Sequence, residues 1–453
     1  MQEVESMKFP KDFMWGVSLA AHQCEGSFEG DGKGRGISER EQFHNPMSDF
    51  YHRYPEDIEM LSQLGIHAFR MSINWSRIYP DPWGEANQIG ISYYRDLLTK
   101  LKEKNIKPIV TLSHYEMPYL ISRINGFVSK ESIDLFMKYV RTCFENFGDL
   151  VEYWLTFNEL NCEHMPGHNK MNGIISSENH LEWDYAALNN KLVCSALATK
   201  LLHEMYPDSR MGNMIGYFPI YPQTCNPKDF LKMMQKTNLL HHICLEVQCN
   251  GEYPYFAWSY FKENGIDIHV TEEQKQILKE GTVDFISMSY YCSNVVTYKY
   301  DLERRSGNQI GGIDNEFLEK NDWGWTIDPE GLRIVLNDCY QRYKMPIVIV
   351  ENGLGAYDTK EEDGSIHDTY RIEYFHDHLS QLAKAVVEDG VDVFGYCLWS
   401  AIDIVSVSAN TISKRYGLIY VDADDDGKGT FDRFRKDSYY YYQKVIATNG
   451  EAI

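Results

Sequence analysis

The chain of 453 residues is 43% hydrophobic and 14% aromatic, which excludes the disordered and fibrous classes of protein. Its formal net charge of −22 argues against non-specific binding to nucleic acid or to a membrane surface, since both are anionic. The ten cysteines are irregularly spaced without a CxxC pair, and the chain shows no basic leader and no apolar run of about 20 residues. These features predict a cytoplasmic protein with reduced thiols.

Short β-rich runs alternate with helical patterns along the chain. Eight such runs cover residues 13–21, 67–75, 107–114, 153–159, 210–220, 283–291, 346–353 and 393–400. A clear helical pattern precedes the last run: apolar positions from Ile372 to Val386 step by three and four, and Gly390 ends it. Asp328 and Pro329 are expected to be the N-cap and first residue of another helix. Eight strand–helix repeats without a linker predict an α/β fold, a single (β/α)8 TIM barrel over residues 1–453.

Two glutamates directly follow apolar strands, at the end of the barrel where this fold places its active sites. Glu159 follows Asn158 in the fourth run, and Glu351 follows "PIVIV" in the seventh. One such carboxylate alone fits a helix N-cap region or a structural ion pair equally well. Two that face a common pit are the minimum apparatus for glycoside hydrolysis, in which one protonates the leaving oxygen and the other attacks the anomeric carbon or activates water. Other strand-end side chains suit a sugar pocket, in which Gln23, His114, Asn158 and Tyr291 would bond hydroxyl groups and Trp399 would stack on ring faces; Arg70 lies on the second strand.

Several longer motifs make the chain resemble a known family. They are "FPKDFMWGVSLAAHQCEG", "HRYPEDIEMLSQLGIHAFRMSINWSRIYP", "TFNE", "DFISMSYY", "ENGLGAYD" and "LWSAIDIVS". In this order they span essentially the whole chain, which closely resembles glycoside hydrolase family 1, the β-glucosidases and 6-phospho-β-glycosidases. The resemblance implies a double displacement that retains configuration, with the two carboxyl groups about 5–5.5 Å apart.

The resemblance also implies a role for each matched residue. Glu159 is expected to be the general acid/base and Glu351 the nucleophile, which Arg70 and Tyr291 orient. Arg70 should keep Glu351 ionised, whereas Glu159 needs a raised pKa to hold its proton near neutrality. The remaining implied substrate contacts are Asn158 at the sugar 2-hydroxyl, Gln23, His114 and Trp399 around the cleaved sugar, Tyr115 within "SHYEMP", and Trp325 near the +1 side.

The stretch "SVSANTISKRYG", residues 406–417, bears on the substrate. Family members that act on plain glucosides resemble one another in a Glu and a Trp where this chain has Ser406 and Val407. A carboxylate there would repel a 6-phosphate, whereas a serine would not. Ser408, Lys414 and Tyr416 match the phosphate clamp of the 6-phospho-β-glycosidase branch, and the charge-assisted bond from the lysine would be its strongest contact. The resemblance therefore implies a 6-phospho-β-glucoside as the small-molecule partner.

Three alternatives stay open. A non-phospho β-glucosidase is one, because plain glucosidases carry a similar "KRFG". A 6-phospho-β-galactosidase is another, although galactoside-type members resemble one another in a Trp at the place of Val407, where gluco-type members have a small residue. A catalytically silent sugar-phosphate binder is the third, although such relatives usually lose one of the two glutamates. The oligomeric state stays open as well.

No cofactor or metal is expected. His164 and His168 are spaced like a helical zinc pair, but the Met-Pro-Gly between them breaks a helix. The segment "DADDDGKG", residues 422–429, resembles a calcium loop but lacks the closing Glu, so an acidic turn is expected. Glu25 and Asp403 are expected to have supporting structural roles, and Arg415 is expected to form a structural ion pair.

Overall fold

The computed structural model describes residues 9–26, 31–37, 46–163, 169–174, 180–300, 312–407 and 409–453. Ser408, His164 and His168 lie outside the described residues. Over that part of the chain, no helix combines the length and apolar character that crossing a bilayer requires.

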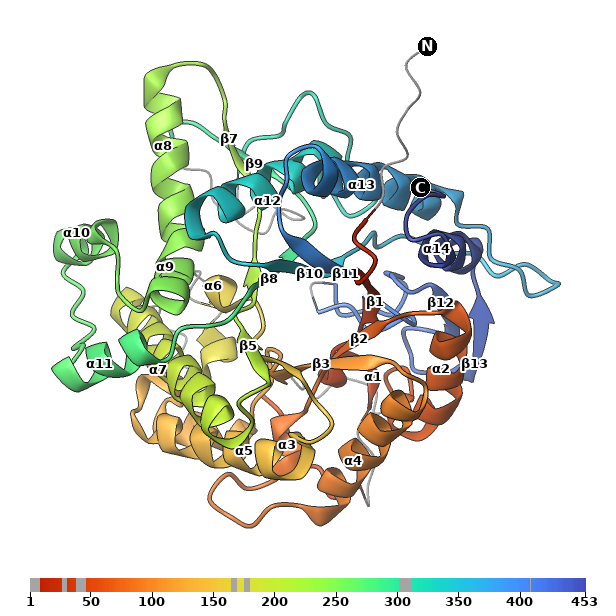
Figure 1. Cartoon of the computed structure of the whole chain (residues 1–453), viewed down its shortest axis with the longest axis horizontal. Coiled ribbons are helices and arrows are strands. Elements are labelled where there is room, and N and C mark those ends of the chain that lie inside the picture. Colours follow the sequence, from red (N-terminus) through yellow and green to blue (C-terminus); the bar gives the residue numbers. More distant parts are fainter. Residues whose placement is uncertain are drawn as a thin grey trace.

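A parallel sheet closed into a barrel forms the centre of the molecule (Figure 1). Its strands are β1 Met14–Ser18, β2 Ala68–Ser72, β3 Lys107–Ser113, β4 Tyr153–Phe157, β5 Arg210–Gly212, β6 Ile215–Gly216, β8 Ile286–Tyr290, β10 Ile347–Asn352 and β11 Val393–Trp399. Neighbours follow the order β5-β4-β3-β2-β1-β11-β10-β8-β6. The two ends of this order, β5 and β6, are consecutive in the chain, and Gly212 also bridges to Phe285. The sheet therefore closes on itself, and the predicted (β/α)8 barrel is confirmed.

The fifth predicted run, residues 210–220, is the one that departs most from expectation. It forms two short strands, β5 and β6, instead of one, and a third, β7 Ile220–Pro222, pairs outside the barrel with β9 Asn294–Val296. Between β5 and β6, the side-chain oxygen of Asn213 accepts from the backbone N–H of Ser287 at 3.0 Å. An amide side chain thus replaces a backbone partner there, which interrupts the ladder without leaving the buried N–H of Ser287 unpaired.

Helices surround the barrel in the alternation that the sequence predicts (Figure 1). The α-helices are α1 Ala21–Cys24, α2 Phe50–Leu64, α3 Trp75–Ile78, α4 Gln88–Glu103, α5 Glu131–Phe147, α6 Leu160–Glu163, α7 Leu181–Met205, α8 Pro227–Thr237, α9 Ile243–Asn250, α10 Tyr255–Asn264, α11 Glu272–Glu280, α12 Pro329–Tyr343, α13 Thr369–Val387 and α14 Asp437–Ala447. The predicted cap of α12 is confirmed, because the Asp328 side chain accepts from the N–H of Gly331 at 2.9 Å and Pro329 begins the helix. A hairpin of β12 Ile419–Ala423 and β13 Gly429–Arg435 follows the last barrel strand.

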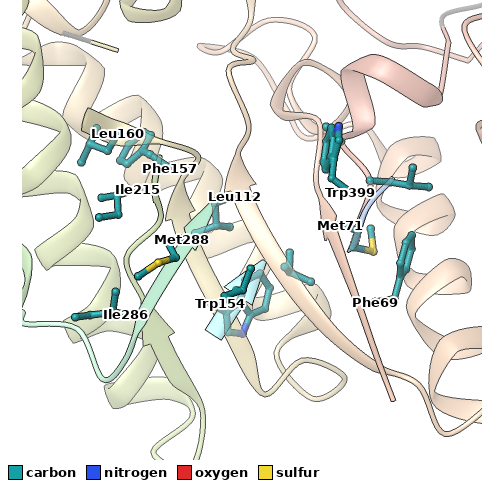
Figure 2. Packing of buried hydrophobic residues seen from close by; sticks show 14 of the residues in the cluster. Phe69, Met71, Leu112, Trp154, Phe157, Leu160, Ile215, Ile286, Met288 and Trp399 are labelled. Carbon is teal, nitrogen blue, oxygen red and sulfur yellow. The ribbon is translucent and has the colours of Figure 1, made fainter. Parts of the chain in front are cut away.

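Strand alternation divides the core into two apolar clusters. Ala68 belongs to the smaller cluster, as do Ile109, Leu155 and Val348 from other strands. Phe69, between Ala68 and Arg70, points the opposite way and belongs to the larger cluster, part of which Figure 2 shows. Arg70 has the same parity as Ala68, so its side chain is aimed into the barrel interior.

Candidate active site

Glu351 lies at the end of β10 and is held by two side chains from other strands. Arg70 on β2 donates to its Oε1, and the hydroxyl of Tyr291, just after β8, donates to its Oε2 at 2.7 Å. The register of β10 against β8 shifts between Ile349 and Glu351. Val350 faces the interior of the barrel, so regular alternation would turn Glu351 the other way. The irregularity interrupts this alternation and allows the side chain of Glu351 to face the barrel interior too.

Glu159 lies two residues beyond the end of β4 and has a different set of partners. Its Oε1 accepts from the hydroxyl of Ser289, and its Oε2 accepts from the hydroxyl of Tyr115. Its backbone adopts a positive φ of 40°, which is uncommon outside glycine and is frequent at functional sites. The N–H of Glu159 meets the sulfur of Met214 at 3.1 Å. Both carboxyl oxygens thus receive neutral hydroxyl donors, and neither contacts a cation directly.

These partners give the two buried carboxyls different acidities. Burial and the charge of Glu351 raise the pKa of Glu159 to about 7, and Ser289, Tyr115 and Arg70 only partly oppose the rise. Burial also raises the pKa of Glu351, but its contacts with Arg70 and Tyr291 favour the ionised form. Because a guanidinium contacts Glu351 and none contacts Glu159, a single proton shared by the pair resides on Glu159.

Arg70 joins the two ends of the site. One terminal nitrogen donates to Glu351, the other donates to the side-chain oxygen of Asn158 at 2.7 Å, and Nε donates to Thr111 at 2.9 Å. The side-chain oxygen of Asn158 is thereby occupied, while its buried Nδ2 has no hydrogen-bond partner among the residues that the structure describes. A donor that is fixed in orientation and left unused by the protein suits a hydroxyl of a bound ligand.

His114 and Trp399 form one wall near Glu351. Their rings stack with centroids 5.7 Å apart at an interplanar angle of 21°, and Nε2 of His114 lies 3.9 Å from Oε1 of Glu351. Burial, together with the charges of Arg70 and His22, lowers the pKa of His114 far below its usual range, so its imidazole is neutral. Gln23 lies in the short helix α1, where its Nε2 donates to the carbonyl of Val405 at 2.9 Å.

Lys414 and Tyr416 belong to a second group of side chains, which Tyr291 connects to Glu351. The Nζ of Lys414 is 4.1 Å from the ring centroid of Trp325 and 4.9 Å from that of Trp323, and the residue is only 1% exposed. The rings of Tyr291 and Trp325 are 5.5 Å apart, so contacts run from Glu351 through Tyr291 and Trp325 to Lys414. Burial lowers the pKa of Lys414 to about 8. The structure thus brings a desolvated ammonium group to within two side chains of Glu351.

Ser406 and Tyr416 complete this side of the site within the described residues. A side-chain hydrogen bond joins them, and both are buried. Burial raises the pKa of Tyr416, and the charge of Glu351 adds to the rise. Val407 points outwards with 38% exposure.

Comparison with known proteins identifies the family. The model of Glycosyl hydrolase family 1 matches residues 5–451. The chain belongs to glycosyl hydrolase family 1. Among its relatives are the "Aryl-phospho-beta-D-glucosidase BglH" of Bacillus subtilis, 42% identical over 98% of this chain and 99% of the relative, and the "Phospho-cellobiase" of Klebsiella oxytoca, 43% identical over 98% and 99%. The solved "Beta-glucosidase from Thermotoga maritima in complex with glucoimidazole" has a TM-score of 0.86 at 31% identity, covering 98% of this chain and 100% of that one.

Within this family 1 barrel, sequence reasoning missed two site residues. Ser289 donates to Glu159, and the ring of Trp323 packs against Lys414. Strand parity is a signal that could have found Ser289, because it lies two residues before Tyr291 at the end of the sixth predicted run. No comparable local signal marks Trp323, because its contact with Lys414 joins two segments that are distant in the chain.

Residues that were expected to have supporting roles in the family 1 chain also have structural counterparts. Glu25 accepts from Arg77 at 3.0 Å and from Tyr94 at 2.8 Å, and therefore has the structural role predicted. Residues 424–428 form the turn of the β12–β13 hairpin, in which Asp424 accepts from the backbone N–H of Lys428 at 2.8 Å. Among the described residues, no group of three or more His, Cys, Asp or Glu side chains is arranged to hold a metal ion.

Proposed function

We propose that this chain is a 6-phospho-β-glucosidase that hydrolyses β-glucosidic bonds of 6-phosphorylated substrates with retention of configuration. The observation that carries the proposal is the contact path from Glu351 through Tyr291 and Trp325 to the buried Lys414. This path places a cation two side chains from Glu351, in a protein whose net charge of −22 otherwise repels anions. Relatives at 42–43% identity carry the names aryl-phospho-β-D-glucosidase and phospho-cellobiase, which supports the same substrate class.

The first chemical step uses the difference in acidity between the carboxyls. Glu351, ionised beside Arg70, attacks the anomeric carbon and forms a covalent glycosyl ester, while the bond from that carbon to the leaving oxygen breaks. Glu159 gives its proton to the leaving oxygen, so the aglycone departs as an alcohol or phenol. Tyr291 and Arg70 hold the two carboxylate oxygens of Glu351 and thereby aim the nucleophile.

The second step reverses the role of Glu159. Ester formation removes the negative charge of Glu351, which is one cause of the raised pKa of Glu159. The ionised Glu159 then takes a proton from water as the water oxygen attacks the anomeric carbon, and Glu351 leaves as a carboxylate. Two inversions at one carbon give net retention. We expect the buried amide of Asn158, which Arg70 orients, to donate to the 2-hydroxyl during both steps.

The phosphate would be bound by Lys414 and Tyr416, with Ser406 beside them and Ser408 as the remaining predicted contact. An ammonium group that is already desolvated forms stronger charge-assisted bonds than one in water, because the cost of removing its hydration has been met by folding. A dianionic phosphate also stabilises the charged form of Lys414, whose pKa burial has lowered. His114, Trp399 and Gln23 would line the pocket of the cleaved glucose, and Tyr115 would hold the acid/base in place.

We further propose that the enzyme is one barrel domain over residues 1–453 and works in the cytoplasm. Eight of the cysteines are free thiols, which suits a reducing compartment; they are Cys24, Cys143, Cys194, Cys225, Cys249, Cys292, Cys339 and Cys397. A phosphorylated sugar carries charge that keeps it from crossing a bilayer unaided, so an enzyme for such sugars works where they are made or delivered.

Paired substrates test the proposal. We expect p-nitrophenyl β-D-glucoside 6-phosphate to be cleaved with a kcat/KM at least about a hundred-fold above that of the unphosphorylated glucoside, because its phosphate adds charge-assisted hydrogen bonds. Proton NMR of the first product should show β-glucose 6-phosphate before mutarotation. Equal hydrolysis of both glucosides would reject the phosphate assignment, and a preference for p-nitrophenyl β-D-galactoside 6-phosphate would reject the gluco assignment. First release of the α-anomer would reject retention.

A further inference from the structure

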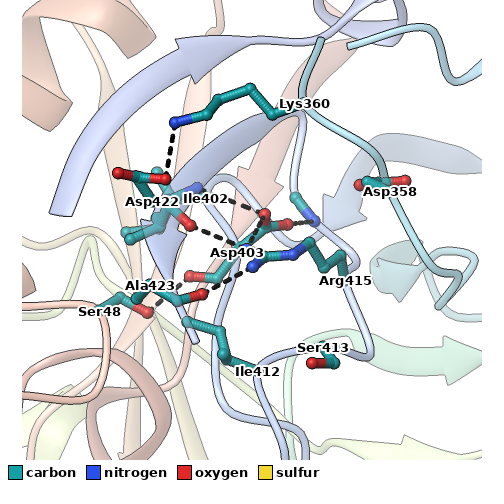
Figure 3. Close-up of polar contacts among 12 residues, drawn as sticks. Ser48, Asp358, Lys360, Ile402, Asp403, Ile412, Ser413, Arg415, Asp422 and Ala423 are labelled. Atoms are coloured by element: carbon teal, nitrogen blue, oxygen red, sulfur yellow. Dashed lines mark hydrogen bonds and ion pairs between the residues drawn. The ribbon is translucent and has the colours of Figure 1, made fainter. Parts of the chain in front are cut away.

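A buried group of three acids and three bases lies behind the residues that would bind phosphate. It consists of Asp358, Asp368, Arg371, Asp403, Arg415 and Lys436, and we call it the Asp403 cluster; Figure 3 shows its centre. We propose that the Asp403 cluster positions Lys414 and Tyr416 relative to Glu351, and that Arg415 is therefore a positioning residue for substrate recognition. The proposal rests on the proposed function, because it concerns how the phosphate contacts are held.

Asp403 is the centre of the cluster and is fully buried. Its Oδ1 accepts from Lys436 at 2.7 Å and from the N–H of Gly417 at 2.9 Å, and its Oδ2 accepts from Arg415 at 2.9 Å and from the N–H of Val421 at 3.3 Å. One carboxylate thus fixes the backbone on both sides of residues 418–420. A side chain at Gly417 would put a Cβ 2.3 Å from the backbone nitrogen of Asp403, so only glycine permits this approach.

The side chain of Arg415 points into the Asp403 cluster, away from the residues that would bind phosphate. It donates to Asp403, to the carbonyl of Val421 at 2.8 Å and to the carbonyl of Ala423 at 2.7 Å. Its neighbours in the chain, Lys414 and Tyr416, face Trp325 and Ser406 instead. In a segment where successive side chains point to opposite sides, fixing the middle one fixes the direction of the other two.

The same cluster also holds the loop that follows Glu351. The backbone groups of Arg415 and Ala356 exchange two hydrogen bonds, each of 2.9 Å. Arg371 donates to the carbonyl of Leu354 at 3.1 Å and to both oxygens of Asp358 at 2.9 and 3.0 Å. Lys436 donates to Asp358 as well as to Asp403, and so ties this loop to the segment that carries Lys414.

The two segments meet closely at Gly355. A Cβ at this position would lie 2.8 Å from Cε of Lys414 and 2.8 Å from Cζ of Tyr416. The loop after the nucleophile therefore packs directly against both residues that would bind phosphate. A shift of the 414–416 segment changes the distance between these residues and Glu351, and a displacement of about 1 Å can cost on the order of a hundred-fold in rate.

The charges explain why such a cluster can remain buried. Burial by itself would raise the pKa of Asp358, but Lys436 and Arg371 lower it to about 2. Three carboxylates face three cations, and each carboxylate accepts at least one further hydrogen bond from a backbone N–H or a hydroxyl group. Removal of one cation leaves an acid without compensation and frees the segment that the cation held.

The test compares Arg415→Met with Arg433→Met. Arg433 is another arginine with a buried side chain, and it makes two bonds of 2.8 Å to Asp57, so its loss should reduce stability to a similar degree. We expect both variants to lower the melting temperature, but only Arg415→Met should raise KM for p-nitrophenyl β-D-glucoside 6-phosphate, by roughly ten- to a hundred-fold. Its kinetics on the unphosphorylated glucoside should match those of Arg433→Met.

Two further measurements keep the outcome decisive. Arg415→Lys retains a cation for Asp403 and serves as the second variant if Arg415→Met does not fold. We expect its KM for the phosphorylated substrate to lie between those of the wild type and Arg415→Met. The inhibition constants of D-glucose 6-phosphate and D-glucose can also be compared, which tests the same contacts without turnover. If Arg415→Met and Arg433→Met have the same KM on the phosphorylated substrate, or Arg415→Lys has the wild-type KM, the positioning role is wrong while the proposed function stands. If the wild type itself shows no preference for phosphorylated substrate, the proposed function and this inference are both wrong.

Discussion

Replacement of Lys414 by methionine tests the substrate assignment most directly. Methionine has nearly the length of lysine and no charge, so the space between Trp323 and Trp325 stays filled. What is lost is the charge-assisted bond to phosphate, worth about 1.5–3 kcal/mol. At about 1.4 kcal/mol per tenfold, this corresponds to a ten- to hundred-fold decrease in kcat/KM on the phosphorylated substrate. The unphosphorylated glucoside makes no such bond, so its kcat/KM should hardly change.

The same variant should not be less stable than the wild type. Burial lowers the pKa of Lys414 from 10.5 to about 8, which means that the folded protein disfavours its charged form. The unfolded chain does not, so below pH 8 the charge of Lys414 opposes folding, and its removal should leave the melting temperature equal or higher. The matched control is Lys138→Met, since Lys138 lies 4.6 Å above the ring of Tyr79 and makes its hydrogen bonds to the carbonyls of Pro82 and Gly84.

The assay is steady-state hydrolysis of the two p-nitrophenyl glucosides at neutral pH, with differential scanning calorimetry of the free proteins. Wild type, Lys414→Met and Lys138→Met are compared. The reasoning is refuted if Lys414→Met retains the wild-type preference for phosphorylated substrate, or if it loses activity on both glucosides alike. A fall in melting temperature with unchanged preference would mean that Lys414 has a structural role only.

The remaining predictions concern the carboxyl pair and one isolated acid. Glu351→Gly should lose hydrolysis by several orders of magnitude, and azide should restore turnover with glycosyl azide of inverted configuration as product; turnover without azide at the wild-type rate would contradict the assignment of nucleophile. Because the pKa of Glu159 is about 7, kcat/KM should fall above pH 7 as the acid loses its proton. In Glu159→Gln this decrease at high pH should be absent for substrates with a good leaving group. If the variant still shows the decrease, another group causes it. Asp184 is buried, its carboxyl has no hydrogen-bond partner among the described residues, and burial raises its pKa to about 6. Its folded-state pKa exceeds the unfolded value, so its proton stabilises the fold at low pH and this stability is lost as the pH rises from about 4 to about 6. Asp184→Asn should therefore raise the free energy of unfolding in urea at about pH 8 but not at about pH 4, and equal effects at both would show that ionisation of Asp184 is not the cause.

The fold was predictable because its signals are local. Each barrel strand is a short apolar run, each helix repeats its apolar positions at three and four residues, and their alternation admits few topologies. The break within residues 210–216 was not predictable, because it depends on the Asn213 side chain meeting the backbone of Ser287, 74 residues away. Replacement of a backbone hydrogen-bond partner by a side chain does not change the pattern of apolar residues from which the strands were predicted.

Glu159 and Glu351 were likewise found from position alone, since a carboxylate at the end of an apolar strand is unusual in itself. Their different environments did not follow from position, and only the family resemblance implied that Arg70 and Tyr291 contact Glu351. Arg70 and Glu351 are 281 residues apart, and Ser289 and Glu159 are 130 apart. Only closure of the barrel brings these partners together. The irregular register of β10, which aims Glu351 into the pit, is also a property of two paired strands and not of one.

By itself, then, the amino-acid sequence determined the barrel, the two glutamates at its strand ends and the lysine-bearing stretch after the last strand. The tertiary structure alone decided how Lys414 connects to Glu351 through Tyr291 and Trp325, and that three acids and three bases lie buried behind it. The physical reason is the range of the interactions. Periodicity and turn preferences act between neighbours in the chain, whereas ion pairs, ring contacts and burial act between segments that only folding brings together.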